Sequence, residues 1–293
     1  MRNLSSDFLA YNDQLYQRED KCEGCDYDCS EESKCEGCLD KKHYKEIERD
    51  YDCANMRCFY VGKYFHKYAS EIGKLFLSAP AFFDSHKELN IISLGCGPCC
   101  DYYGIKKAVD TLNKDNRINY TGVDLNDGWH NHNDWLIANS DDNISLKYMN
   151  VFDFLTTPEE YVNNKTNIIT ICYLVSELLN AGQNIDLFFD LLTEKLFPLL
   201  VPNGLIIFND INRGVNQRDA RFQFDRYVNT LPKNYNVKIA RRFYVSDTKD
   251  IWAPDYYYRV SNNKTIFDID PGKIVYNPWG FCSSAQLLIV KTK

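Results

Sequence analysis

A pair of glycines, Gly95 and Gly97, follows a short apolar run in the first third of the chain. Glycine permits a tight turn and a close approach of the backbone to a ligand, and the helix expected next presents free N–H groups. The carboxylate of Asp124, which ends a second apolar run, can accept both hydroxyl hydrogens of a ribose. Asn150 and Asp153, just past a third run, can hydrogen-bond the edge of an adenine. These side chains, each at the end of a predicted strand, indicate a nucleoside-binding site.

The sequence narrows the kind of nucleoside cofactor. A dinucleotide fingerprint requires a third glycine, and Cys100 stands at that position. No Walker lysine follows the loop, so nucleoside triphosphate binding has no support. For the glycine pair taken alone, a purely structural turn is an open alternative.

Cysteines are the second group of residues that could do chemistry. The chain has 12, and most of those near the N-terminus form two copies of Lys-Cys-Glu-Gly-Cys, at 21–25 and 34–38. Each Cys-x-x-Cys is typical of a knuckle, a turn that points two thiolates at one ion. We therefore predict a zinc site on four thiolates: Cys22, Cys25, Cys35 and Cys38. Further side chains leave a second zinc site, a binuclear cluster or an iron–sulfur centre open: Cys29, His43, Cys53 and Cys58.

An amphipathic helix over residues 57–77 is expected to cover the cofactor pocket. Its apolar side chains recur at helical spacing between Val61 and Leu75. Charged side chains take the other face of this helix: Lys63, Lys67, Glu71 and Lys74. Residues 1–20 before it are expected to form a polar helical or poorly ordered arm.

From residue 90 onward, predicted strands and helices alternate. The strands are expected at 90–94, 118–124, 145–150, 167–172, 204–210, 237–244 and 286–291, and helices at 101–113 and 186–200. Continuous apolar strands that alternate with helices predict a mostly parallel sheet covered on both faces. The last two strands have no strong helix between them and are expected to close the sheet as an antiparallel pair.

Four matches carry a resemblance to a known family: Ile-Ile-Ser-Leu-Gly-Cys-Gly at 91–97, Asp124, Asn-Val-Phe-Asp at 150–153, and Pro-Asn-Gly at 202–204. With these residues, the segment 60–293 resembles a class I S-adenosylmethionine-dependent methyltransferase. The resemblance implies that the glycine loop holds the methionine part of the cofactor, Asp124 the ribose, and segment 150–153 the adenine. The resulting cofactor-binding set is Gly95, Cys96, Gly97, Asp124, Leu125, Asn150, Val151, Asp153 and Cys172, although core packing also accounts for Cys172.

Three positions depart from the family pattern. Cys99 stands where a third glycine is usual, Ser93 replaces the customary acid before the loop, and Asn150 stands where aspartate is frequent. The implied fold class is α/β: a Rossmann-like, seven-stranded, mostly parallel sheet with an antiparallel closing strand. We place a small metal-stabilised module at 1–58, because it has almost no aliphatic residues, and the S-adenosylmethionine-binding domain at 59–293.

Tyr173 and Glu177, at the end of the fourth strand, are candidates for orienting or deprotonating a substrate. The segment lacks the Asn/Asp-Pro-Pro-aromatic signature of enzymes that methylate exocyclic base amines. Because a sulfonium is already an activated methyl donor, alignment in a dry pocket supplies much of the rate. Glu177 has a structural alternative, since a carboxylate at the start of a helix complements the helix dipole.

The net charge is −7, and only the C-terminal third of the chain is basic. Its arginines are Arg213, Arg218, Arg221, Arg226, Arg241 and Arg242, and its aromatic residues include Trp252, Tyr256, Tyr257, Tyr258, Trp279 and Phe281. Arginine with interleaved aromatics suits stacking and phosphate contacts with RNA, whereas packing of the closing strands explains the aromatics equally well. RNA is therefore the first expected substrate, followed by a protein or a small molecule. A non-catalytic scaffold subunit with a methyltransferase fold is the alternative from a different class.

The remaining expectations concern partners and location. The acidic N-terminal module suits docking to a protein. No apolar run reaches the ~18 residues of a membrane span, and the first 20 residues lack a signal peptide's apolar stretch. We expect no membrane partner and a cytoplasmic location. His130 and His132, in the loop after Asp124, are expected to be solvated rather than to bind metal.

Overall fold

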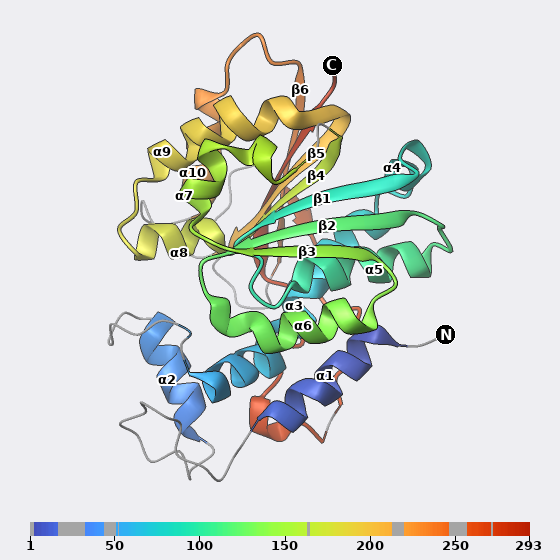
Figure 1. Ribbon diagram of the computed structural model, residues 1–293, viewed down its shortest axis with the longest axis vertical. Coiled ribbons are helices and arrows are strands. Elements are labelled where there is room, and N and C mark those ends of the chain that lie inside the picture. Colours follow the sequence, from blue (N-terminus) through green and yellow to red (C-terminus); the bar gives the residue numbers. More distant parts are fainter. Residues whose placement is uncertain are drawn as a thin grey trace.

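The computed structural model describes residues 3–16, 33–43, 51, 53–162, 165–212, 220–245, 257–270 and 272–293. A central sheet with the strand order β3-β2-β1-β4-β5-β8-β6-β7 runs through this part of the chain (Figure 1). Its strands are β1 (Glu88–Leu94), β2 (Arg117–Asp124), β3 (Asn143–Tyr148), β4 (Thr166–Cys172), β5 (Leu200–Ile211), β6 (Val237–Tyr244), β7 (Tyr258–Val260) and β8 (Ser284–Lys291).

The first five strands are parallel, and β8 lies antiparallel between β5 and β6. This arrangement confirms the predicted α/β, Rossmann-like sheet and its closing antiparallel pair. The predicted number of seven strands is wrong for the described residues, because β7 pairs with β6 as an eighth strand at the edge. With three residues, β7 is too short to show the period-2 pattern by which a strand is recognised in a sequence.

Helices cover both faces of the sheet. The helices of the described residues are α1 (Leu4–Leu15), α2 (Ser33–His43), α3 (Ala54–Leu77), α4 (Ala81–Ser85), α5 (Cys100–Thr111), α6 (His130–Asn139), α7 (Val151–Thr156), α8 (Leu174–Asn180), α9 (Ile185–Leu191) and α10 (Ala220–Thr230). The predicted helix at 186–200 is α9 continued by a π turn, η3 (Leu192–Leu196), and a 3-10 turn, η4 (Phe197–Leu199). Helices α1, α3, α5 and α6 lie on one side of the sheet and α7 to α10 on the other (Figure 1).

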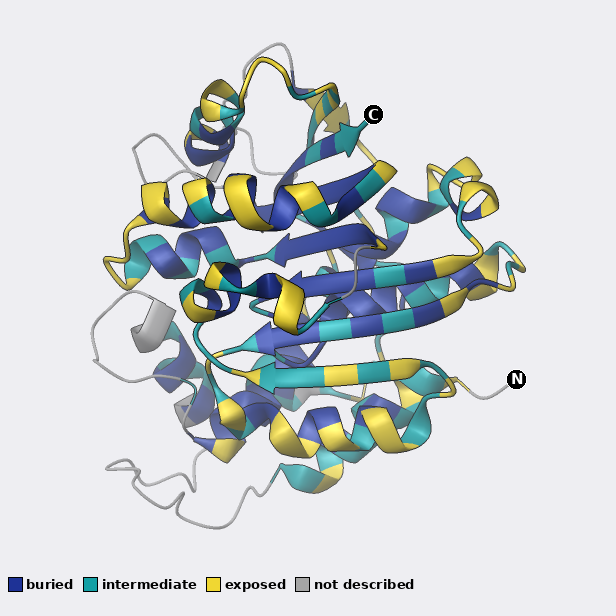
Figure 2. Ribbon diagram, turned by 45° about the horizontal axis from the view of Figure 1, so that its top comes forward, coloured by how far each residue is buried: buried dark blue, intermediate teal, exposed yellow. Residues whose placement is uncertain are grey.

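Alternate residues of the central strands supply two apolar clusters, one under each layer of helices. Ile91 and Ile168 point to the cluster beneath α3 and α5, whereas Ile92 and Ile169 point to the cluster beneath α7 and α9. Strand β3, at the edge, has no fully buried residue, so burial is greatest in β1, β4 and β5 (Figure 2). The carboxyl ends of the central strands are thereby fixed by packing on both faces.

Helix α3 confirms the amphipathic helix predicted at 57–77, and it crosses α5 at two glycines. A Cβ atom built on Gly104 would lie 2.3 Å from the carbonyl oxygen of Ala69, and one on Gly73 would lie 3.0 Å from the carbonyl oxygen of Gly104. Close contact of the two backbones therefore requires glycine at position 104. Because α5 starts directly after the glycine loop, this crossing places the earlier turns of α3 beside that loop.

The charged face of α3 is buried, contrary to its expected role as the polar side of an amphipathic helix. Lys63, Lys67 and Glu71 are 6%, 8% and 0% exposed. The C-terminal segment covers this face: Trp279 N–H donates to the carbonyl oxygen of Lys63 at 2.7 Å, and Ser283 N–H donates to Glu71 Oε1 at 2.8 Å. Helical periodicity distinguishes an apolar face from a polar face. It does not show that a distant segment of the chain will cover the polar face.

The N-terminal arm is a helix, α1, packed against α3, α5 and α6. Phe8 is fully buried, with its ring centroid 4.7 Å from that of Tyr103 and 5.5 Å from that of Phe65. Asn12, also fully buried, donates to the carbonyl oxygen of Cys58 at 3.1 Å. Among the described residues, no helix has the length and apolar character to cross a membrane.

Candidate active site

The glycine loop joins β1 to α5 by the predicted tight turn, and its glycines are in the left-handed conformation. Gly95 has φ +68° and Gly97 has φ +49°, and Cys99, which caps α5, has φ +57°. The N–H of Gly95 donates to the carbonyl oxygen of Val123 at 2.8 Å, which ties the loop to the end of β2. The turn therefore depends on glycine at 95 and 97, whereas Cys99 adopts a positive φ at a cost of about 1 kcal/mol or more.

Asp124 lies at the end of β2 and bridges two backbone segments. Its Oδ2 accepts from Gly97 N–H at 2.7 Å and its Oδ1 from Asn126 N–H at 2.9 Å. A carboxylate has about four acceptor positions, and a ribose hydroxyl is a donor of the kind that it accepts. Leu125 beside it is 66% exposed and presents an apolar surface at the same edge of the sheet.

The third strand end also lies at this edge. Met149 N–H donates to the carbonyl oxygen of Asp124 at 2.8 Å, which holds segment 149–153 against β2. Asn150 caps α7 by accepting from Phe152 N–H at 2.9 Å. Val151 is buried, whereas Asp153 in the first turn of α7 is exposed. The structure thus brings Gly97, Asp124 and Asn150 to one edge and leaves the Asp153 side chain facing solvent.

Four cysteines surround the loop: Cys96, Cys99, Cys100 and Cys172. A hydrogen bond with Cys99, and then burial, raise the pKa of Cys96, and burial raises the pKa of Cys100 and Cys172 well above the usual value. These three side chains are neutral thiols at neutral pH. Because nucleophilic attack requires a thiolate, these three cysteines contribute to packing rather than to catalysis.

Tyr173 follows β4 directly, in a left-handed conformation with φ +57°. Its hydroxyl donates to Glu71 Oε2 at 2.7 Å, and its N–H donates to the carbonyl oxygen of Asn209 at 2.7 Å. Burial and then the charge of Glu71 raise the pKa of Tyr173 well above its usual value. The phenol is thus neutral and fixed in orientation, which fits an orienting role and excludes a phenolate base.

Helical patterning placed Glu71 on a polar face and not in the site, although this residue is the centre of a buried network. Besides Tyr173, its two carboxylate oxygens accept from Asn209 Nδ2 at 3.0 Å, Ser283 N–H at 2.8 Å and Ser284 N–H at 3.1 Å. These donors come from β4, β5 and the start of β8. Glu71 therefore locks α3 to the carboxyl edge of the sheet.

Glu177 lies in the first turn of α8, half-buried, in the position expected for a carboxylate that complements a helix dipole. Its charge also helps to raise the pKa of Tyr60 and of Asp210, which places it near both side chains. Asp210, the penultimate residue of β5, accepts from Ser176 N–H at 3.0 Å, and burial raises its pKa to about 6. Both interpretations of Glu177, the helix-start carboxylate and the candidate catalytic residue, therefore stay open.

Only part of the predicted metal site lies within the residues that the structure describes. Cys22, Cys25 and Cys29 lie outside the described residues, and His43 ends α2. Cys35 and Cys38 are buried in α2, so the interpretation of 34–38 as a knuckle turn is wrong: this copy is an α-helix. Burial raises the pKa of Cys58 to about 12. In the described part of the chain, no three or more side chains are grouped as metal ligands.

The arginines expected to contact RNA are bound within the chain wherever the structure describes them. Arg221 is buried, Arg226 pairs with Asp186, and Arg241 Nε lies 2.8 Å from Asp225 Oδ1. Arg242 is half-buried, and its Nη1 lies 3.4 Å from Ser78 Oγ. Arg213, Arg218, Trp252 and Tyr256 lie outside the described residues, and Tyr257 is buried. Exposed aromatic rings are found at Tyr258, Trp279 and Phe281.

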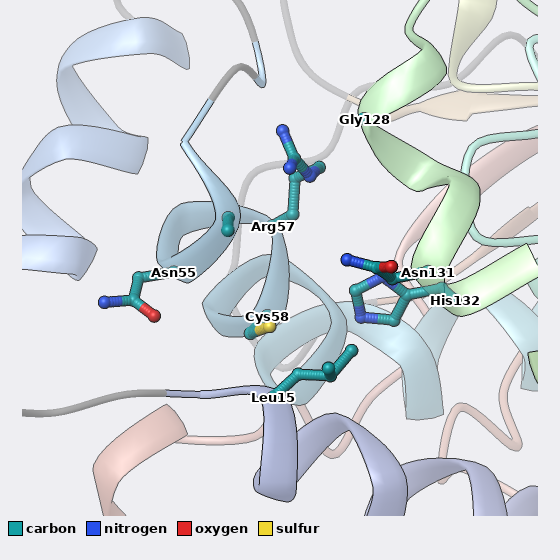
Figure 3. A pocket seen from close by; sticks show the side chains of 8 residues that line it. Leu15, Asn55, Arg57, Cys58, Gly128, Asn131 and His132 are labelled. Atoms are coloured by element: carbon teal, nitrogen blue, oxygen red, sulfur yellow. The ribbon is translucent and has the colours of Figure 1, made fainter. Parts of the chain in front are cut away.

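A separate pocket of about 170 Å³ lies where α1, α3 and the start of α6 meet (Figure 3). It is lined by Leu15, Ala54, Asn55, Arg57, Cys58, Gly128, Asn131 and His132. The expectation that His132 is solvated is wrong: it is 2% exposed, and its Nε2 lies 2.9 Å from Asn12 Oδ1. Burial and then the charge of Arg57 lower its pKa to about 3, so the ring is neutral. Helix α1 covers this residue, which the local sequence could not show.

Comparison with known proteins gives matches among solved structures. No protein-family model and no curated protein matches this sequence. The chain is similar to a putative class I S-adenosylmethionine-dependent methyltransferase from Listeria monocytogenes, with 12% identity, 100% of this chain and 89% of that chain covered, and a TM-score of 0.48. An O-methyltransferase from Bacillus cereus in complex with SAH has 11% identity, coverage of 88% and 91%, and a TM-score of 0.44. A putative rRNA methylase from Clostridium thermocellum has 15% identity, coverage of 74% and 96%, and a TM-score of 0.43. At these low identities, the similarity to solved structures concerns the fold alone.

Proposed function

We propose that this chain is an S-adenosylmethionine-dependent methyltransferase. One observation carries the proposal: the left-handed glycine loop is hydrogen-bonded through Gly97 N–H to Asp124, whose own backbone holds the segment that starts α7. Three strand ends therefore act as one binding edge, as expected for a ligand at the carboxyl ends of parallel strands.

The residues at this edge fit the cofactor. A Cβ atom on Gly97 would meet nothing closer than the Trp129 ring at 3.9 Å, so the backbone is open to a ligand there. Asp124 offers acceptors for ribose hydroxyls, and exposed Leu125 offers an apolar surface for a base. When bound, the cofactor supplies a methyl group on an activated sulfonium.

The chain's own residues would orient the acceptor and exclude water. The first half of α3 lies over the edge, and Tyr173 is held there by Glu71. Glu177, in the first turn of α8 that Tyr173 caps, would take a proton from an acceptor hydroxyl or amine. Because the methyl donor is already activated, positioning of the acceptor supplies most of the rate enhancement that the protein must provide.

Calorimetry with S-adenosylmethionine, followed by a radiolabelled methyl assay on total RNA, total protein and small molecules, tests the proposal. Micromolar binding with transfer to one fraction is expected. Binding without transfer to any fraction would favour the scaffold subunit instead, and no binding at all would overturn the proposal.

Asp124→Ala is expected to raise the dissociation constant of S-adenosylmethionine ten- to over a hundredfold. The variant loses charge-assisted hydrogen bonds to the ribose, at about 1.5–3 kcal/mol. Asp127→Ala, an exposed carboxylate three residues on, is the matched control and should bind as the wild type does. Equal affinity for all three proteins, with circular dichroism unchanged, would remove Asp124 from the site.

We also propose that the N-terminal segment, within 1–58, binds zinc through Cys22, Cys25, Cys35 and Cys38. The repeated Lys-Cys-Glu-Gly-Cys supports this, and α2 leaves Cys35 and Cys38 one turn apart. A cytoplasmic location would keep these clustered thiols reduced and able to bind metal.

Elemental analysis of protein purified without chelators is expected to find one zinc per chain, and Cys22→Ser with Cys25→Ser should lower that content. Loss of metal should unfold this segment and make it protease-sensitive, because metal binding there is folding energy. Iron with visible absorbance would indicate a cluster instead. Metal-free native protein would contradict the proposal.

A further inference from the structure

Asn133, a fully buried residue of α6, makes three side-chain hydrogen bonds directly behind the glycine loop. Its Nδ2 donates to the carbonyl oxygen of Gly97 at 3.2 Å and to Tyr148 Oη at 3.3 Å. Its Oδ1 accepts from Cys99 Sγ at 3.5 Å. An amide has two donor hydrogens, and both are used here. Because a carbonyl oxygen can only accept, the bond to Gly97 also fixes which end of the Asn133 amide faces the loop.

Gly97 is therefore held from two sides. Its N–H donates to Asp124 Oδ2 at 2.7 Å, and its carbonyl oxygen accepts from Asn133. These two groups belong to the two peptide planes on either side of the Gly97 Cα atom. Glycine adopts positive and negative φ about equally readily, so nothing intrinsic to Gly97 keeps its φ at +49°. Side chains from β2 and α6 fix the conformation instead.

The same amide contacts the costly residue of the turn. Cys99 is fully buried and has a φ of +57°, which a residue other than glycine adopts only where its surroundings hold it there. Its N–H donates to the carbonyl oxygen of Cys96 at 2.8 Å, and its thiol donates to Asn133. Asn133 thus contacts both Gly97 and Cys99, on either side of Pro98.

Tyr148 extends these contacts to a third strand end. It is the last residue of β3 and lies beside Asp124 in the parallel pairing of β2 with β3. Since its hydroxyl accepts the second hydrogen of the Asn133 amide, Asn133 joins the loop after β1 to the end of β3. Asp124 joins the same loop to the end of β2. The three strand ends are thereby connected through two side chains.

From these contacts we infer that Asn133 is a positioning residue of the S-adenosylmethionine site, which acts through the carbonyl group of Gly97 to preform the glycine loop. The inference rests on the proposed methyltransferase function. Asn133 is fully buried behind the loop, so it orients the loop without touching the cofactor. A loop that is already ordered costs no ordering free energy when the ligand binds. Loss of the Asn133 amide should therefore weaken binding of the methionine part, which this loop is expected to hold, more than binding of the nucleoside.

Asn133→Leu tests the inference, because leucine branches at the same carbon atom but forms none of the three hydrogen bonds. Calorimetry with the full-length variant is expected to show at least a tenfold higher dissociation constant for S-adenosylmethionine, about the effect of one hydrogen bond. The dissociation constant of 5′-methylthioadenosine, which lacks the amino-acid part, should rise less than threefold. A general loss of structure would weaken both ligands alike, so equal changes, or no change, would overturn the inference.

Asn133→Ala provides the same two measurements if the leucine variant does not fold, since it removes the amide without adding an apolar side chain. Failure of the wild-type protein to bind S-adenosylmethionine would remove the proposed function together with the inference. Normal binding by the wild type and by both Asn133 variants would overturn the inference alone.

Asn167→Leu is the matched control. Asn167 is 4% exposed near the start of β4, at the other end of the sheet. Its Nδ2 donates to the carbonyl oxygen of Glu88 at 2.6 Å and its Oδ1 accepts from Asn90 N–H at 2.8 Å. This variant should lower the denaturation midpoint, as Asn133→Leu does, and leave the dissociation constant of S-adenosylmethionine unchanged. Equal dissociation constants for the two variants would show that Asn133 has a structural role only.

Discussion

Glu71→Ala is expected to lower the free energy of unfolding by about 5 kcal/mol, because each buried donor left without an acceptor costs about 1–3 kcal/mol. Four donors lose their acceptor: Tyr173 Oη, Asn209 Nδ2 and the N–H groups of Ser283 and Ser284. Since a domain of this kind is stable by only about 5–15 kcal/mol, the variant should be barely folded at room temperature. Urea denaturation followed by circular dichroism measures the change.

Two further variants keep this prediction open to contradiction if Glu71→Ala is insoluble. Glu71→Gln retains one acceptor oxygen for the N–H groups of Ser283 and Ser284 and should lose about half as much stability. Glu88→Ala removes an exposed carboxylate that lies 4.0 Å from Arg117, and should change stability by less than about 0.5 kcal/mol. Equal stability of Glu71→Gln and Glu88→Ala would show that the network does not hold α3 in place.

Gly104→Ala is expected to destabilise the protein by about 2–3 kcal/mol, although alanine is the better helix former by about 1 kcal/mol. The added Cβ would lie 2.3 Å from the Ala69 carbonyl oxygen and 2.9 Å from the Gly73 backbone nitrogen, and neither backbone atom can rotate away. Helix α3 must shift, and it carries Tyr68 and Glu71 with it. Methyl transfer should therefore fall together with the denaturation midpoint.

Gly37→Ala is the matched control for this substitution. Gly37 lies inside α2, and a Cβ atom there would meet nothing within 4 Å. Only the gain in helix propensity remains, so stability should rise by up to about 1 kcal/mol. If both alanine variants proved stabilising, close contact of α3 with α5 would not be needed for the fold.

Local sequence determined the framework of this protein. Continuous apolar runs such as 90–94 and 167–172, separated by helical segments, define parallel strands because both faces of such a sheet are buried. The glycines at 95 and 97 define the loop, since only glycine takes a positive φ freely. Asp124 and Asn150 could be placed because the carboxyl ends of parallel strands lie along one edge. Each inference depends on residues close together in the chain.

Only the tertiary structure decided what covers that edge. The charged residues of α3 suggested a polar face, yet Glu71 is fully buried because donors from β4, β5 and β8 meet its carboxylate. His132 is buried because α1, more than a hundred residues earlier, lies on it. The ring contacts of Tyr68 with Tyr173 and of Tyr64 with Trp279 exist only because α3, the end of β4 and the C-terminal segment come together. Periodicity fixes the faces of a helix or strand, whereas their burial depends on long-range contacts, which a local pattern does not encode.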